Sequence, residues 1–460
     1  MERTLVDKPQ TASSTTWHRR IGASILVTVL ICSIAWVTIR VFNRPSSANS
    51  SGSHQGATIM TTARDGTSGC STDADGAKII IAGADPSGTC SLPQEVEFTN
   101  TYSPKTHEGA DFEGSDFAKI IFYDKEYESL ASDYDLFLLA KGEDLSAHEA
   151  AIYLEQGVLG SGVPTLIFKS EPYKSPYAGE EGFFRSDIRS MPIEGPNARQ
   201  VTVMYSSTNT VNGGTYGPDG RLYFCFKGAK LGDHVKSPGI YSVDPSNWAD
   251  WRAVVTSWGG KMFNSPNDVI VKSDGTLWFT DPPYGWAQGS GGEPQVGNWV
   301  WRFDPKTGHV APVADGFQRP NGIVFSPDEK TLYIGDSGWL TGHPGESLFD
   351  PSGKRTVYAF DVLEDRILSN RRLIYTADKF VPDAIKRDAA GRLYIGCGDG
   401  VHVTSPTGVL LAKILVNTPK PTANMCFGKG KNKNTLYIMS KNLLVAATLG
   451  SVEGQYVGPS

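Results

Sequence analysis

One phrase recurs along the larger part of the chain: a turn of Asp, Gly or Pro, followed by a short apolar strand. The copies recur at intervals of roughly 45 to 60 residues, which is typical of the blades of a β-propeller. They are GPDGRLYFC from Gly217, KSDGTLWFTD from Lys272, SPDEKTLYIGD from Ser326, RDAAGRLYIGC from Arg387 and KNKNTLYIMS from Lys431, with TLIFKS from Thr165 as a degenerate first copy. The repeat therefore predicts an all-β fold, a six-bladed β-propeller over residues 116–460.

Other architectures fit this repeat less well. Separate hairpin domains of this size would lack a core of their own, and a β-helix needs a much shorter repeat. The 50 Gly and 28 Pro residues agree with many short strands joined by tight turns. Two further strand-like segments, 118–124 and 136–142, are predicted to pair with the last copy and close the ring, which leaves no long free edge.

The amino-terminal part contains an uncharged run at 21–39, rich in Ile, Val and Leu, that is about long enough to cross a hydrocarbon core. We expect a single transmembrane helix over 21–41, acting as a signal-anchor, after a cytoplasmic tail over 1–20. More Lys and Arg residues precede the run than follow it, which places the amino terminus in the cytoplasm and the propeller on the lumenal or extracellular side. Cleavage of a signal peptide, followed by secretion, is the alternative.

Residues 42–115 comprise a Ser/Gly-rich stalk and an unassigned segment. Asn49 begins a glycosylation sequon, and Cys70 and Cys90 could form a disulfide in an oxidising lumen. Three other cysteines lie in or beside apolar strand-like segments and are predicted to be small buried hydrophobes: Cys225, Cys397 and Cys426. The net charge of −6 and the absence of a long basic block argue against nucleic acid as a partner.

Polar residues recur just before the repeated phrase, where the innermost strand of each propeller blade begins. The segments are HEAAIY from His148, VNGGT from Val211, NSPNDVIV from Asn264, RPNGIVFS from Arg319, FVPDAIKRD from Phe380 and TANMCFG from Thr422. Because innermost strands begin near one mouth of the central channel, these side chains could converge. Carboxylate and amide oxygens suit a hard cation such as Ca²⁺ or Mg²⁺ better than zinc, although Mn²⁺ and Zn²⁺ stay open.

Each candidate also has an ordinary structural interpretation. Asn or Asp before Gly is common turn chemistry, and a turn or a lining role is favoured for Asn212. Repetition of one pattern in successive blades favours ligand roles for Asn267 and Asn321. A carboxylate at Glu149 is unfavourable to bury unless a cation pairs with it, although Glu171 is a rival for the same role.

Two further residues of these segments, Asp383 and His148, are weighed between a ligand role and a structural role. Asp383 follows Pro382 and precedes an apolar residue, so a ligand role is favoured over a turn. His148 is ambiguous, and a structural role is favoured for it.

These phrases together resemble the gluconolactonase/regucalcin family of six-bladed propellers, particularly its fungal lactonohydrolase branch. The similar stretches are FNSPNDVIVKSDGTLWFTDPPYG from Phe263, GFQRPNGIVFSPDEKTLYIGDS from Gly316 and FVPDAIKRDAAGRLYIGCGDGVHV from Phe380. The resemblance implies one divalent ion, usually Ca²⁺, held at four positions: Glu149, Asn267, Asn321 and Asp383. One departure is that the family's PDG reads PDA here, with Ala384 in place of Gly.

The resemblance also implies hydrolysis of a small-molecule lactone or related ester. The ion would polarise the carbonyl group, and Asp383 would accept a proton from the attacking water. Candidates to line the mouth and orient the substrate are Asn212, Asn264, Asp281, Tyr284 and Asn424. Two alternatives are a tailoring hydrolase or isomerase of secondary metabolism that uses the same metal site, and a non-catalytic, metal-stabilised binding propeller.

Overall fold

The computed structural model describes residues 25–31, 35–41, 59–62, 117–157, 160–177, 180, 182–343, 348–364, 366–456 and 458–459. The chain divides into two compact units, Met1–Tyr102 and Ser103–Ser460. Asn49, Cys70 and Cys90 lie outside the described residues.

The first unit contains an antiparallel sheet of three strands, β1 (Ile25–Ile31), β2 (Ala35–Val41) and β3 (Ile59–Thr62). The described part of the predicted membrane segment therefore lies in strands, and the helix expected over 21–41 is not supported. Its many Ile, Val and Thr residues are β-branched, which favours strands. Within the described ranges, no helix is long and apolar enough to cross a membrane.

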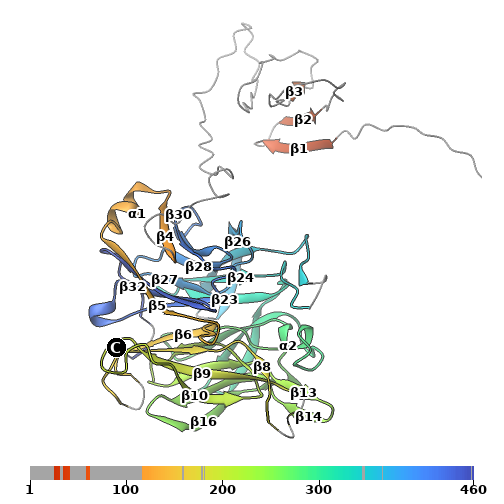
Figure 1. Ribbon diagram of the computed structural model, residues 1–460. Helices are drawn as coiled ribbons and strands as arrows, with labels where there is room; N and C mark the ends of the chain where they lie inside the picture. The colour runs from red at the N-terminus through yellow and green to blue at the C-terminus, as the bar shows by residue number, and fades with distance from the viewer. Residues whose placement is uncertain are drawn as a thin grey trace, which may run out of the picture. The chain divides into compact units, whose positions relative to one another are not determined.

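The second unit is a six-bladed β-propeller, as the repeat predicts, and its first three blades follow one another along the chain (Figure 1). Blade 1 consists of β6 (Glu149–Leu154), β7 (Thr165–Lys169), β9 (Phe184–Pro192) and β10 (Thr202–Ser207), with the short β8 (Tyr173–Lys174) beside β9. Blade 2 consists of β11 (Val211–Tyr216), β12 (Leu222–Phe226), β15 (Gly239–Asp244) and β16 (Asn247–Val255). Blade 3 consists of β19 (Val269–Val271), β20 (Leu277–Asp281), β21 (Trp299–Asp304) and β22 (His309–Ala314).

The remaining blades repeat this antiparallel pattern. Blade 4 consists of β23 (Pro320–Phe325), β24 (Thr331–Asp336), β25 (Thr356–Leu363) and β26 (Ile367–Thr376). Blade 5 contains β27 (Ile385–Arg387), β28 (Leu393–Cys397), β29 (Gly400–Thr404) and β30 (Leu410–Val416), and blade 6 contains β31 (Asn424–Phe427), β32 (Thr435–Ser440) and β33 (Leu443–Leu449). The connections include the hairpins β13 (Ala229–Leu231) with β14 (His234–Lys236) and β17 (Ser257–Trp258) with β18 (Lys261–Met262), α2 (Tyr284–Ala287) and the 3₁₀ turn η4 (Gly430–Asn432).

The two amino-terminal strands of the propeller close the ring on different blades. β5 (Tyr134–Lys141) pairs with β33 and forms the outer strand of blade 6, as predicted. β4 (Ala118–Phe122) pairs instead with β30 and adds a fifth strand to blade 5, so its predicted pairing with the last repeat is wrong. The short helix α1 (Lys125–Leu130), capped by Asp124, lies between the two strands and lets them reach neighbouring blades. Figure 1 shows these orange strands beside the blue carboxy-terminal ones.

The core lies between adjacent blades, because each sheet buries its faces against its neighbours. For example, Ile152 and Ile167 of blade 1 pack in one cluster with Leu222 and Phe224 of blade 2. The repeated phrase forms the second strand of every blade, and this strand supplies much of each cluster. The three cysteines that were predicted to be buried are confirmed as buried free thiols: Cys225, Cys397 and Cys426.

Candidate metal and active site

Backbone and side-chain hydrogen bonds join the starts of the innermost strands from blade 2 round to blade 5. Gly213 N donates to Asn267 O over 2.7 Å, linking blades 2 and 3. The Thr280 hydroxyl donates to Asn321 O over 2.8 Å, linking blades 3 and 4. Gly322 N donates to Asp383 O over 3.1 Å, linking blades 4 and 5.

The same ring is completed between blades 5, 6 and 1. Ala384 N donates to Ala423 O over 3.1 Å, and the Asn424 side-chain amide reaches the Glu149 carboxylate over 2.7 Å. Hydrogen bonds at or beside the innermost strands therefore link the blades in succession from blade 2 round to blade 1.

Two buried carboxylates of this ring, Glu149 and Asp383, interact electrostatically. Burial raises the pKa of Glu149 well above its usual value, and the charge of Asp383 raises it further. Burial also raises the pKa of Asp383 to about 7, although a hydrogen bond with Asn321 opposes this. Lys169 lowers the pKa of both groups, but not enough to cancel the effect of burial. Such an arrangement favours an additional bound cation or proton.

Two amides beside these carboxylates have oxygens free to bind a cation. The Asn321 Nδ2 donates to the Ser337 hydroxyl over 3.1 Å, and Ser337 in turn donates to Pro382 O over 2.5 Å, which fixes the orientation of the amide. The Asn321 Oδ1 is buried and has no hydrogen-bond partner among the described residues. The buried side chain of Asn267 likewise makes no hydrogen bond within the described ranges.

These four side chains fit a hard divalent cation. Two carboxylates and two amide oxygens without partners form the all-oxygen donor set that Ca²⁺ prefers. Glu149, Asn267, Asn321 and Asp383 could therefore hold such an ion. The rival residue Glu171 is engaged elsewhere, in an ion pair with Lys441 over 2.7 Å and in a contact of 3.0 Å with His148 Nε2.

Asn424, expected to line the mouth, contacts the Glu149 carboxylate. Only 1% of its surface is exposed. Its Nδ2 donates to Glu149 Oε2, and its own Oδ1 accepts a hydrogen bond of 2.9 Å from Met425 N. Asn424 is therefore a positioning residue for the Glu149 carboxylate.

Asp281, also expected to line the mouth, is fully buried and holds a loop in place. Its carboxylate accepts hydrogen bonds from Asn264 N over 2.9 Å, Ser265 N over 2.8 Å and Trp301 Nε1 over 3.2 Å. Asp336 plays the corresponding role in blade 4, where it accepts from two backbone amides. A carboxylate at the end of the second strand is thus part of the blade architecture.

Asn264 belongs to the same loop. Its side-chain Nδ2 donates to Asp281 O over 3.2 Å and to Gly297 O over 3.1 Å. It is buried, its Nδ2 contacts support the loop that carries Asn267, and its Oδ1 has no hydrogen-bond partner among the described residues.

The two remaining lining candidates are placed beside the site. Tyr284 begins α2, and its hydroxyl donates to Leu340 O over 3.3 Å. Burial raises its pKa, and the charge of Asp383 raises it further, so the phenol lies close to that carboxylate. Asn212 is the second residue of β11, and its side-chain amide makes no hydrogen bond among the described residues.

The sequence interpretation missed three lysines at the ends of second strands. Lys169 is the last residue of β7. Lys227 directly follows β12, and Lys441 directly follows β32. Lys169 Nζ lies 2.9 Å from His148 Nδ1, and burial with this neighbouring charge lowers the pKa of His148 well below its usual value. The signal was present in the repeated phrase, because three of its six copies, TLIFK, LYFCFK and TLYIMSK, carry a lysine at this point.

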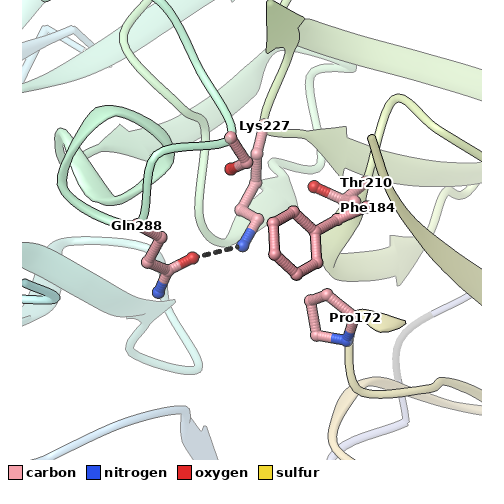
Figure 2. Close-up of a pocket in the computed structure, with 6 residues that line it drawn as sticks. Pro172, Phe184, Thr210, Lys227 and Gln288 are labelled. Carbon is pink, nitrogen blue, oxygen red and sulfur yellow. Dashed lines mark hydrogen bonds between the residues drawn. The ribbon is translucent and has the colours of Figure 1, made fainter. Parts of the chain in front are cut away.

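A small pocket of about 80 Å³ opens beside Lys227 (Figure 2). Its lining consists of Pro172, Phe184, Thr210, Lys227, Gln288 and Ser290. The Lys227 ammonium donates to Gln288 Oε1 over 2.8 Å. Burial lowers the pKa of Lys227 to about 7. The charges of Lys169, Glu171 and Glu149 also act on this pKa. Because Glu149 is a candidate ligand, the pocket borders the ring of candidate ligands.

A second acidic cluster is not a comparable cation site. Asp378, Asp399 and His402 lie together in blade 5. The buried ammonium of Lys413 already contacts both carboxylates, at 2.7 Å and 3.2 Å. The chain itself therefore supplies a cation to this cluster.

Comparison with known proteins agrees with this fold. Residues 247–442 match the SMP-30/gluconolactonase/LRE-like region. The chain is 30% identical over 334 residues to lactonohydrolase oryL of Aspergillus oryzae, covering 68% of this chain and 70% of the relative. It is 28% identical over 339 residues to the gluconolactonase of Zymomonas mobilis, covering 72% of this chain and 86% of the relative. A solved gluconolactonase from Xanthomonas campestris superposes with a TM-score of 0.56 at 25% identity, over 73% of this chain and 96% of that one. The chain belongs to the SMP-30/gluconolactonase/LRE-like family.

Proposed function

We propose that this protein hydrolyses a lactone or a related cyclic ester and depends on a divalent cation, best matched by Ca²⁺. The observation that carries the proposal is the pairing of two buried, mutually repelling carboxylates with two unpartnered amides in one ring: Glu149, Asp383, Asn267 and Asn321. The relatives named lactonohydrolase and gluconolactonase support the same reaction.

The residues of the ring divide the work of hydrolysis. When bound, the cation supplies a Lewis acid for the lactone carbonyl oxygen. The Asp383 carboxylate accepts a proton from water as the water oxygen adds to the carbonyl carbon. The ring C–O bond then breaks, and the ring oxygen takes the proton that Asp383 had accepted, which gives a hydroxy acid and regenerates the Asp383 carboxylate. A bound cation would keep the Asp383 carboxylate ionised, so that it can act as a general base at neutral pH.

Other side chains of the site position these groups. Asn424 holds the Glu149 carboxylate, and Ser337 orients the Asn321 amide. Tyr284 and Asn212 are the candidates for orienting the lactone ring. None of these positioning residues exchanges a proton in the proposed reaction.

The test is hydrolysis of a lactone panel by the full chain, with and without a chelator, beside Asp383→Asn. We expect turnover that the chelator abolishes, that added Ca²⁺ restores and that the variant lacks. Asp133→Asn, on an exposed carboxylate, is the matched control and should keep full activity. Retained cation binding without turnover of any lactone would contradict the proposal and favour a binding propeller. Turnover of open-chain esters alone would favour a tailoring hydrolase.

The location of the propeller is a separate proposal. We infer that it lies on the lumenal or extracellular side of a membrane, because an uncharged apolar run at 21–39 follows a basic segment and precedes a sequon at Asn49. A glycosidase-sensitive mass shift that Asn49→Gln removes would support this location. Recovery of the unglycosylated chain in the cytosol would contradict it.

A further inference from the structure

Lys227 is a buried cation without a partner of opposite charge. Only 4% of its surface is exposed, and its ammonium has one hydrogen-bond acceptor, the neutral amide oxygen of Gln288. No carboxylate lies within ion-pair distance of it among the residues that the structure describes. Burial of an unpaired charge is unfavourable, so this ammonium is poised to bind an anion.

Lys413 shows how the same fold treats a buried lysine that serves structure alone. Its side chain is fully buried, and the Asp378 and Asp399 carboxylates lie 2.7 Å and 3.2 Å from its ammonium. These neighbours raise its pKa, although burial opposes this. Lys413 therefore has two carboxylate partners, whereas Lys227 has none among the described residues.

The pocket beside Lys227 has the size and lining for a small organic acid group. Its volume is about 80 Å³, which accommodates a carboxylate with a short carbon link. The apolar side chains of Phe184 and Pro172 lie across the pocket from the ammonium, as Figure 2 shows. Such a wall excludes water from the side of a bound carboxylate and strengthens its interaction with Lys227.

The neighbouring charges also favour an anion. Lys169 is close enough to lower the pKa of Lys227. Glu171, the carboxylate next along the chain from the pocket residue Pro172, is already paired with Lys441 and His148. Because the nearest carboxylate is paired, the ammonium of Lys227 is left to an incoming group.

We propose that this pocket binds a carboxylate carried by the substrate, so that the preferred lactone is an acidic one. Lys227 donates hydrogen bonds to the carboxylate, Gln288 orients the ammonium, and Phe184 packs against the carbon link. Lys227 is then a specificity-determining residue that does not touch the reacting ester. This inference rests on the proposed function, because it names the substrate class of the same site.

The kinetic experiment compares a lactone that bears a ring carboxylate, 5-oxotetrahydrofuran-2-carboxylate, with its carboxamide. For Lys227→Met we expect kcat/KM for the acid to fall about 10- to 100-fold, the usual contribution of a charged hydrogen bond. The value for the neutral carboxamide should change little. Equal losses for the two lactones would mean that Lys227 acts on the ring itself, and no loss for either would mean that it binds no carboxylate. Either result overturns the proposal.

A second variant guards against a folding defect in Lys227→Met. Gln288→Glu places a carboxylate at the position that now lies 2.8 Å from the ammonium, on an exposed residue, so it should occupy Lys227 without disturbing the core. We expect the same selective loss for the acidic lactone. Lys261→Met, on an exposed lysine of β18, is the control and should match the wild type.

A binding measurement separates this inference from the proposed function. Calorimetric titration of the Ca²⁺-loaded full chain with succinate requires no turnover, and succinamide serves as its neutral counterpart. Succinate binding that Lys227→Met weakens supports the pocket even if no lactone is hydrolysed. Succinate binding that both variants leave unchanged overturns the pocket even if lactones are hydrolysed.

Discussion

The Asn424 amide donates a hydrogen bond of 2.7 Å to the Glu149 carboxylate, across 275 positions of the chain. This contact joins the last blade to the first at the point where the candidate cation ligands meet. It links closure of the ring to the geometry of the site, because Glu149 keeps its orientation only when blade 6 is docked beside blade 1.

Replacement of Asn424 tests this link. We expect Asn424→Ala to weaken Ca²⁺ binding about 10- to 100-fold, as is usual when a partner that orients a metal ligand is lost. Titration of the metal-free protein by calorimetry measures the change. The matched control is Asn432→Ala, because Asn432 Nδ2 donates to the Tyr153 hydroxyl over 3.0 Å and joins the same two blades away from the candidate ligands. Equal Ca²⁺ affinity in the two variants would contradict the positioning role.

Removal of the cation should destabilise the propeller. The charge of Asp383 raises the pKa of Glu149, and a bound cation would relieve this repulsion. Ca²⁺ at about 100 times its dissociation constant should add about 2.7 kcal/mol to the free energy of unfolding. Thermal unfolding with and without a chelator measures this. Asp383→Asn removes one of the two charges and should raise the Tm of the metal-free protein and abolish the Ca²⁺ response. An undiminished Ca²⁺ response in that variant would refute the assignment of Asp383.

Asp281→Asn should destabilise the fold by about 1–3 kcal/mol, the usual effect of leaving a buried donor unsatisfied. The carboxylate accepts two backbone amides and the Trp301 indole, and an asparagine would direct its own NH₂ group at one of these donors. Urea unfolding measures the difference, and Asp133→Asn, on the surface, is the neutral comparison. A stability equal to wild type would show that the loop does not depend on this carboxylate.

Lys227 should give the stability a distinctive dependence on pH. Its pKa is about 7 in the folded chain, below the usual value for lysine. Between about pH 7 and 10 the unfolded chain therefore holds a proton that the folded chain has released, and stability rises with pH. We expect the free energy of unfolding of the wild type, measured relative to that of Lys227→Met, to increase as pH rises through this window. Urea titrations at pH 6, 8 and 9.5 measure the gap. Parallel pH profiles would show that Lys227 stays protonated, and Lys261→Met is the control.

The sequence by itself determined the fold class, the number of blades and the residues from which the ring is built. A repeat with a turn and a buried strand specifies a blade locally, because each copy must bury its faces against the next. The SPND, PNG and PDA phrases mark where the innermost strands begin, so Asn267, Asn321 and Asp383 could be found without coordinates. Closure by β5 was also predictable, because a ring leaves its last blade in need of an outer strand.

Only the tertiary structure decided which polar residue faces the channel and which faces the protein. Asn424 has the same local sequence signal as the candidate ligands, yet it holds Glu149, and Asp281, at the end of a second strand, holds a loop. Pairing of β4 with blade 5 rather than blade 6 likewise depends on the chain reversal at α1. These outcomes arise from contacts between residues far apart in the chain. The unpaired ammonium of Lys227 is of the same kind, since the absence of a partner is visible only when all neighbours are in place.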